Sequence, residues 1–236
     1  MLDDVLLQHF LHEFHGYGSY EAPWWFIGME EGGGNDEAEV IRRLLAWDKR
    51  GRLELEDVTE YHREFGVTKF WKTMPPTQPT WRQLIRLLLT AKLNQTGQVT
   101  LNQIREYQRD KWGRHGSETC LLDLLPLPSP KANAWGYNVW SNMSQLLSRD
   151  SYREWLAPKR IEIIRRQIAR HRPKFVVLYG KAYFKYWQEI ANIASWTDDP
   201  SGFSIQKSGS TTFAAVPHPA SKWSSSFWTT VGSRLA

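Results

Sequence analysis

The chain has 236 residues, one cysteine and 13 tryptophans, and its formal net charge is +5. A chain of this length suits one large domain, or at most two, and can bury a sizeable core. The single Cys120 excludes a disulfide framework and a cysteine metal cluster, which fits a reducing compartment. Asp3 and Asp4 stand where a secretion signal would be basic, and no apolar run approaches the length of a membrane span. We therefore expect a cytoplasmic protein with no membrane partner.

The basic charge and the aromatic content of 14% suit a nucleic-acid surface. Cations contact phosphates, and aromatic rings stack on bases or wedge between them. An ordinary basic protein with a tryptophan-rich core would have the same composition. Composition alone therefore leaves both interpretations open.

In the first half we expect a helix over 2–14, a strand over 24–29 and a helix from Asp36 to about Lys49. A polar and irregular insertion or long loop follows over 51–79. Two further helices are expected to begin at Thr80 and Thr100. The strand is apolar on both faces, as in the interior of a parallel sheet. Each helix after that strand begins with Asp or Thr followed three residues later by Glu or Gln, the pattern of a capping box.

The second half is expected to begin with a strand over 119–125 and a proline-rich turn. A helix capped at Ser151 and a helix over 159–170 with arginines on its solvent side follow. The chain is then expected to form a strand over 175–179, a helix through Ile190, a strand over 212–216 and a C-terminal helix. Helices that alternate with short apolar strands predict an α/β protein. We expect a three-layer α/β/α sandwich around a mainly parallel, four-stranded sheet, with residues 1–236 in a single domain.

In such sheets the ligand site lies beyond the carboxyl ends of the strands. That rule selects the loops at 30–35, 123–137, 180–181 and 217–226, whose polar residues include Glu30, Glu31, Asp123 and His218. Adjacent carboxylates repel each other and resist burial, so their place at the end of a buried strand favours an active-site loop. A solvated turn is the alternative.

The segments at these strand ends resemble the uracil-DNA glycosylase superfamily. The sequence GMEEG at 28–32 is similar to the first motif of that family, and HPAS at 218–221 is similar to its second motif, His-Pro-Ser. Asp123 stands where the family ends a strand with an Asn that reads the base. The order of the strands matches from about Trp24 onward. The family cluster held by four cysteines is excluded here.

The resemblance implies a monomeric DNA glycosylase without a cofactor or metal, with DNA as its partner. Glu30 would stabilise the cation that forms on the sugar, and His218 would stabilise the departing base. The implied base-binding residues are Asp123, Gly28, Met29 and Glu31, with a stacking ring from Phe70, Trp71 or Trp81. The implied DNA-binding residues are Gly32, Gly33, Lys181, Ser221, Lys222, Trp223 and Ser224, of which Trp223 would be the wedge that replaces the flipped base.

The departures from the family bear on the substrate. An ionised Asp123 accepts hydrogen bonds only and favours an exocyclic amine, whereas a protonated Asp123 could also donate to a ring nitrogen. The favoured substrate is therefore a modified cytosine, of the kind found in phage DNA, followed by uracil or another deaminated base. The product would be an abasic site in an uncut strand, because no lysine stands out for lyase chemistry.

Each assignment has an alternative. His218 could bridge within its own loop, Asp123 could bind backbone amides of the proline-rich turn, and Trp223 could pack the last helix. Glu31 suits a structural or solvated role. Arg160, Arg165, Arg166 and Arg170 suit a solvated helix face. At the level of function, the alternatives are a hydrolase of free nucleosides or nucleotides, and a protein that binds damaged or foreign DNA without cleaving it.

Overall fold

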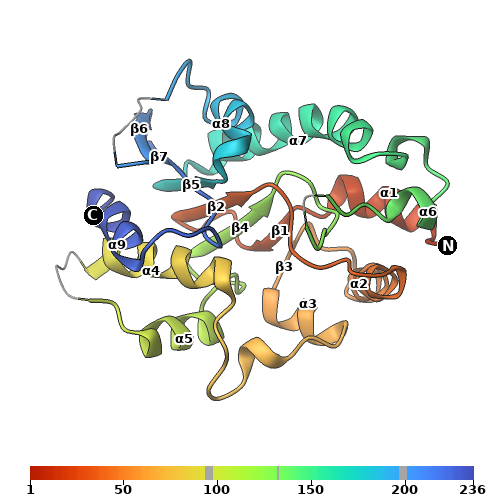
Figure 1. The fold of residues 1–236 in the computed structure, drawn as a ribbon, viewed down its shortest axis with the longest axis horizontal. Coiled ribbons are helices and arrows are strands. Elements are labelled where there is room, and N and C mark those ends of the chain that lie inside the picture. The colour runs from red at the N-terminus through yellow and green to blue at the C-terminus, as the bar shows by residue number, and fades with distance from the viewer. Residues whose placement is uncertain (94–97, 132, 197–200) are drawn as a thin grey trace.

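The computed structural model describes residues 1–93, 98–131, 133–196 and 201–236, which form an α/β protein around one sheet (Figure 1). Within these residues, seven strands are arranged in the order β3-β1-β4-β2-β5-β7-β6. The strands are β1 (Gly16–Gly18), β2 (Trp24–Gly28), β3 (Leu55–Glu56), β4 (Thr119–Asp123), β5 (Phe175–Tyr179), β6 (Ser204–Ser208) and β7 (Thr211–Val216).

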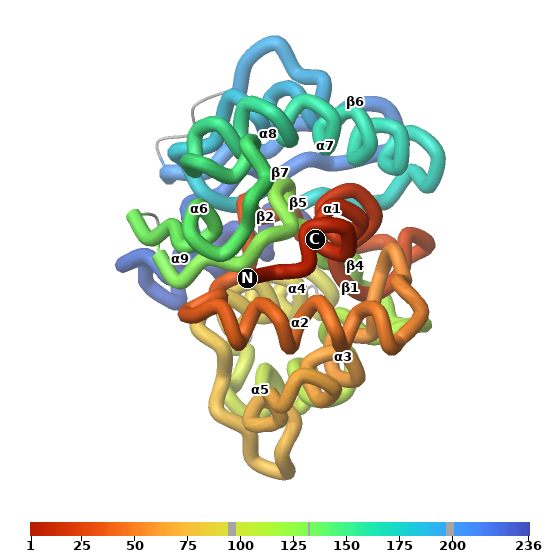
Figure 2. Tube along the Cα trace, turned by 90° about the vertical axis from the view of Figure 1, so that its right-hand side faces the viewer, coloured from red at the N-terminus to blue at the C-terminus, as the bar shows by residue number. Residues whose placement is uncertain are grey.

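Helices cover both faces of the sheet, as in a three-layer α/β/α sandwich. The helices are α1 (Asp4–Glu13), α2 (Glu37–Lys49), α3 (Val58–Glu64), α4 (Pro79–Leu93), α5 (Leu101–Asp110), α6 (Tyr137–Trp140), α7 (Arg149–His171), α8 (Phe184–Ala191) and α9 (Ser225–Arg234). Both views place α7 and α8 on one side of the sheet and α4 and α5 on the other (Figures 1 and 2). The two chain ends lie at opposite ends of the molecule (Figure 1).

The four strands expected from the sequence form the parallel centre of the sheet. β2 pairs in parallel with β4 on one side and β5 on the other, and β5 pairs in parallel with β7. Side chains of β2 pack on both faces, since Trp25 and Phe26 point to opposite faces and both are buried. The continuous apolar pattern therefore identified the interior strands correctly.

The expectation of only four strands is wrong, because the sheet also has β3 and β6 at its two edges and β1 between β3 and β4. β1 is antiparallel to β4, β3 is parallel to β1, and β6 is antiparallel to β7. β1 and β3 are only three and two residues long, and the edge strand β6 is polar, so none of the three has the continuous apolar run that marks the central strands.

The segment 51–79 is not irregular as expected, since it contains β3, α3 and a 3₁₀ turn at Lys69–Trp71. The Asp57 carboxylate caps α3 by accepting hydrogen bonds from the amides of Thr59 and Glu60 at 3.0 and 3.1 Å. Val58 and Tyr61 of α3 are buried. Short length and a polar composition hid this helix in the sequence.

Two of the four expected helix caps are confirmed. The amide of Glu39 donates to Asp36 at 2.7 Å, and Thr100 forms a complete capping box with Gln103. The helix expected from Thr80 begins at Pro79, and the Gln78 side chain accepts from the Trp81 amide. A proline at the first position of a helix loses no hydrogen bond, so it extends the helix by one residue.

The helix expected to begin at Ser151 is part of the longer α7. It begins at Arg149, and the Ser148 hydroxyl accepts from the amide of Ser151 at 3.0 Å. The helix then continues through Pro158 to His171.

Arg160 on α7 is buried, which contradicts the expected solvated face at this position. Its guanidinium donates to the backbone carbonyls of Phe14, Asp123 and Leu124 at 3.1, 2.9 and 3.2 Å. Arg160 therefore ties the end of β4 to α7 and to the residue after α1. Arg166, on the same helix, is exposed as expected, and so are Arg165 and Arg170.

We predict that Arg160→Leu destabilises the fold by about 3–5 kcal/mol, because three buried carbonyl groups lose their donor. Urea unfolding should show a lower midpoint at an unchanged slope. Arg166→Leu on the same helix is the control and should change stability by less than about 0.5 kcal/mol. Equal effects of the two substitutions would contradict the structural role of Arg160.

Candidate active site

A cavity of about 360 Å³ lies beyond the carboxyl ends of the central strands. Gly28 and Asp123 are paired in register at the ends of β2 and β4, so the loops that follow them begin at the same height on the sheet edge. Of the residues predicted from the sequence, those that line the cavity are Met29, Glu30, Glu31, Gly32, Trp81, Asp123 and His218. The volume is typical of a small-molecule site, for which about 300–1,000 Å³ is usual.

Glu30 is half-buried beside Arg149, and one carboxylate oxygen forms an ion pair with that guanidinium. The other oxygen, Oε2, is buried and has no hydrogen-bond partner among the residues that the structure describes. Burial raises the pKa of Glu30, and Arg149 opposes that rise. A buried, unpartnered carboxylate oxygen in a cavity is available to a ligand or to water.

Arg149 also fixes the loop after β4. Its Nη2 donates to the Ser129 hydroxyl and to the carbonyls of Lys131 and Ala134, at 3.2 and 2.7 Å for the carbonyls. The guanidinium lies 5.4 Å from the centre of the Trp135 ring. One buried arginine therefore connects Glu30 to the loop that forms the opposite wall of the cavity.

Glu31 is held by three side chains. Its Oε2 accepts from the Tyr17 hydroxyl at 2.7 Å and from Arg43 at 3.0 Å, and its Oε1 lies 3.1 Å from His62 Nε2. Burial alone would raise the pKa of Glu31, but Arg43, followed by His62 and Tyr17, lowers it to about 2. Both oxygens are engaged by the protein, which favours the structural role over contact with a base.

Asp123 is half-buried at the end of β4, and no hydrogen bond within the described ranges engages its carboxyl group. Burial, followed by the nearby charge of Glu31, raises the pKa of Asp123 to about 8. At neutral pH the group is therefore a neutral acid that can both donate and accept. The alternative that Asp123 binds amides of the proline-rich turn is not supported by this geometry.

His218 is exposed at the rim of the cavity. The amide of Ala220 donates to His218 Nδ1 at 3.2 Å, so Nδ1 is unprotonated and the proton is carried by Nε2. Burial of part of the ring lowers the pKa of His218, which favours this neutral form. The residue therefore bridges within its own loop through Nδ1 and retains Nε2–H as a donor.

Protein atoms lie against two glycines in and beside the first motif, Gly28 and Gly33. A Cβ on Gly28 would lie 2.2 Å from the hydroxyl of Tyr179, and a Cβ on Gly33 would lie 2.5 Å from Arg43. Gly33 also has a φ of 123°, which disfavours other residues. Protein packing, and not close approach of a nucleotide, therefore accounts for these two glycines.

The three candidate stacking rings lie in different places. Trp81 lines the cavity, whereas Phe70 lines a neighbouring cavity. Trp71 is buried and lines neither of them, with its ring centre 6.0 Å from that of Trp81. Trp81 is therefore the one of these three that is placed to stack on a ligand in the cavity.

The predicted DNA-binding residues of the last loop lie outside the cavity. Ser221, Lys222, Trp223 and Ser224 are exposed between β7 and α9, and Lys181 is exposed directly after β5. The Trp223 ring packs at 4.2 Å from that of Phe227 and keeps 37% of its surface exposed. Its position is compatible with both packing and a wedge.

Several residues of the site carried no signal in the sequence. Tyr17, Tyr179, Tyr183 and Lys131 line the cavity, and Arg149, Arg43 and His62 hold its two glutamates. Tyr179 ends a predicted strand and Lys131 lies in a loop that the sequence selected, but none of these residues was itself a candidate. His62 lies on the short helix α3, next to the buried Tyr61. Recognition of this helix in the sequence could have indicated His62 as a residue of the site.

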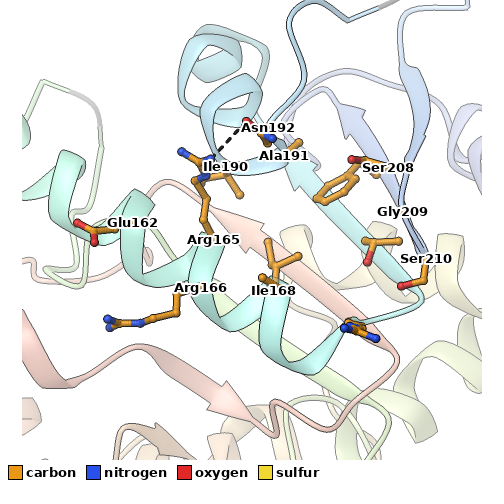
Figure 3. A pocket seen from close by; sticks show the side chains of 14 residues that line it. Glu162, Arg165, Arg166, Ile168, Ile190, Ala191, Asn192, Ser208, Gly209 and Ser210 are labelled. Atoms are coloured by element: carbon orange, nitrogen blue, oxygen red, sulfur yellow. Dashed lines mark hydrogen bonds between the residues drawn. The ribbon is translucent and has the colours of Figure 1, made fainter.

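A separate pocket lies at the start of β7, between α7, α8 and the β6–β7 turn (Figure 3). Arg165, Arg166 and Arg172 line it, and Arg165 donates to the Asn192 side chain at 3.3 Å. It contains none of the residues predicted for the site. The cavity beyond the ends of the strands is therefore the candidate active site.

Comparison with models of protein families gives no match for this chain, and comparison with curated proteins gives none either. Over the described ranges, no group of three or more His, Cys, Asp or Glu side chains is arranged to hold a metal ion. In the same residues, no helix has the length and apolar character needed to cross a membrane.

We predict that Glu31→Gln removes stability that depends on pH. The pKa of Glu31 is about 2 in the fold and near 4.5 in an unfolded chain, so its contribution is fully present above about pH 4.5 and is lost as the pH falls toward 2. The contribution should be about 3 kcal/mol at pH 7.

The free energy of unfolding in urea, measured at pH 7 and pH 3, checks this prediction. The difference between wild type and Glu31→Gln should be large at pH 7 and should shrink at pH 3. Glu106→Gln, at an exposed site on α5, is the control and should have little effect at either pH. A difference that does not depend on pH would contradict the role given to the carboxylate.

Proposed function

We propose that this protein is a DNA glycosylase that hydrolyses the N-glycosidic bond of a modified base, with a modified cytosine as the favoured substrate and uracil or another deaminated base as the next. The observation that carries the proposal is that Glu30, Asp123 and His218 line one cavity at the carboxyl ends of the strands. A buried carboxylate, a neutral acid and a neutral imidazole supply the three interactions that such a reaction needs.

Cleavage of the bond between sugar and base places positive charge on the sugar and negative charge on the base. The free Oε2 of Glu30 would stabilise the sugar cation and accept a proton from the water that attacks C1′. His218 would donate from Nε2 to the base oxygen where negative charge develops. The products are the free base and an abasic site.

Asp123 would bind the Watson–Crick edge of the base. Its neutral carboxyl group can donate to N3 of cytosine and accept from the exocyclic amine. A proton shared with N3 also withdraws electrons from the ring, which makes cytosine a better leaving group. The same carboxyl could pair with uracil by exchanging its donor and acceptor, but uracil has no basic N3 to receive the proton. The neutral acid therefore favours cytosine.

We predict that the purified protein produces alkali-labile sites in DNA that contains one of a panel of bases. The panel comprises uracil, hypoxanthine, cytosine, 5-hydroxymethylcytosine and glucosylated 5-hydroxymethylcytosine. Glu30→Gln should lower the rate by about 10²–10⁴-fold, because it removes the negative charge beside the sugar. Binding of DNA should persist in this variant.

The outcomes separate the candidate functions. Release of base from free nucleosides, with DNA binding that does not change with salt, would instead indicate a nucleoside hydrolase. Tight, salt-dependent binding without cleavage of any substrate would indicate a binding protein. An unchanged rate in Glu30→Gln would remove Glu30 from the mechanism.

We also predict a bell-shaped dependence of the rate on pH for a cytosine-type base. The rate should rise as Glu30 loses its proton, above its ordinary pKa, and fall as Asp123 ionises through about pH 8. Asp123→Asn should abolish the fall at high pH, since an amide does not titrate. The amide cannot protonate N3, so this variant should lose more activity on cytosine than on uracil. A fall near pH 8 that persists in Asp123→Asn would contradict the assignment.

A further inference from the structure

A second cavity of about 800 Å³ adjoins the candidate active site. The two cavities share Glu31, Gly32, Gln78 and Trp81 as lining residues. The second cavity is bounded by α2, by α3 with the segment that follows it, and by the start of α4. The proposed reaction uses none of this space.

Gly32 lies at the junction of the two cavities. A Cβ built on Gly32 would meet no atom within 4 Å, and the residue is not among the glycines with positive φ. Gly33 and Gly34 beside it have positive φ and would clash with Arg43 and with the Pro128 carbonyl. Neither the backbone nor packing requires a glycine at position 32, so the space beside it is free for a ligand.

The walls of the second cavity suit a polar ligand. Arg42 and Lys69 are exposed on it and form no ion pair within the residues that the structure describes. The rings of Phe70 and Trp81 are half-buried there, 5.7 Å apart between centres. Cationic donors beside aromatic faces can hydrogen-bond hydroxyl or phosphate oxygens and cover the apolar face of a ring.

The boundary with the active site is rigid at Glu31. Its carboxylate oxygens contact Tyr17, Arg43 and His62, and these three side chains fix its position. The other lining residues that the two cavities share are Gly32, Gln78 and Trp81, so a group that extends from one cavity into the other passes Gly32 and these two residues.

The assigned contacts indicate which atom of a pyrimidine faces this passage. The sugar is attached at N1 beside Glu30, the oxygen at C2 meets His218, and positions 3 and 4 meet Asp123. The remaining edge of the ring is C5–C6. C5 takes no part in base pairing, so a substituent there is compatible with duplex DNA.

We propose that the second cavity binds a large polar substituent on C5 of the flipped base, such as a sugar, which reaches it past Gly32. This inference rests on the proposed glycosylase function. It names the substrate class as pyrimidines enlarged at C5, and it assigns Arg42, Lys69 and Phe70 to recognition of the substituent.

The test compares wild type with Gly32→Phe on DNA that contains cytosine, 5-hydroxymethylcytosine or glucosylated 5-hydroxymethylcytosine. Wild type should cleave the glucosylated base with the highest kcat/KM. Gly32 also lines the active-site cavity, so Gly32→Phe should lower the values for all three bases, but it should lower the value for the glucosylated base at least about 10-fold more than the values for the two smaller bases. The thermal unfolding midpoint should change little, because a Cβ at position 32 meets no protein atom within 4 Å and the residue is exposed.

Lys69→Ala is a second test variant, and Lys72→Ala is its matched control. Both lysines are exposed, but Lys72 does not line the second cavity. Lys69→Ala should lower kcat/KM for the glucosylated base by about 3–10-fold, and Lys72→Ala should not. This comparison does not depend on the folding of Gly32→Phe.

Two kinds of result overturn the proposal, and they are distinguishable. Cleavage of the smaller bases with no cleavage of the glucosylated base would reject the second cavity as a substituent site and leave the glycosylase function intact. An equal loss on all three bases in Gly32→Phe would assign the space to a flanking nucleotide instead. No cleavage of any base by wild type would reject the proposed function itself.

Discussion

The adjacent carboxylates of Glu30 and Glu31 repel each other at the end of a buried strand, and each is neutralised by an arginine from a different helix. Arg43 of α2 binds Glu31, and Arg149 of α7 binds Glu30. Neither carboxylate could remain ionised at this depth without its partner. The two ion pairs fix both side chains in the lining of one cavity.

The same arrangement separates the proton affinities of three acids within one site. Glu31 is surrounded by donors and has a pKa of about 2, whereas Asp123 has none and has a pKa of about 8. The negative charge of Glu31 contributes to the rise at Asp123. Burial raises the pKa of Glu30 as well, and Arg149 opposes that rise. Such a spread lets one carboxylate support the fold, another act as an anion and a third donate a proton.

The sequence predicted the parts of the fold that depend on apolar patterns and missed those that depend on pairing. The interior strand β2 is apolar along its whole length and was recognised, whereas β1, a Gly-Tyr-Gly segment, has no pattern to recognise. Arg160 and Arg166 lie on one helix with similar local sequence, yet one is buried and the other exposed. The difference arises from the carbonyls that surround Arg160, which come from distant segments of the chain.

In the site, too, the sequence predicted some features and missed others, and its glycines show what the sequence could not predict. Position at a strand end placed Glu30, Asp123 and His218 in one cavity, but the sequence could not indicate that Tyr179 covers Gly28 or that Arg43 lies against Gly33. In the sequence these glycines and Gly32 look alike, as small residues of one flexible run. In the structure two of them make room for protein atoms, and Gly32 does not. Neither the backbone nor packing requires a glycine at this position, and the proposed substituent of the base would account for it.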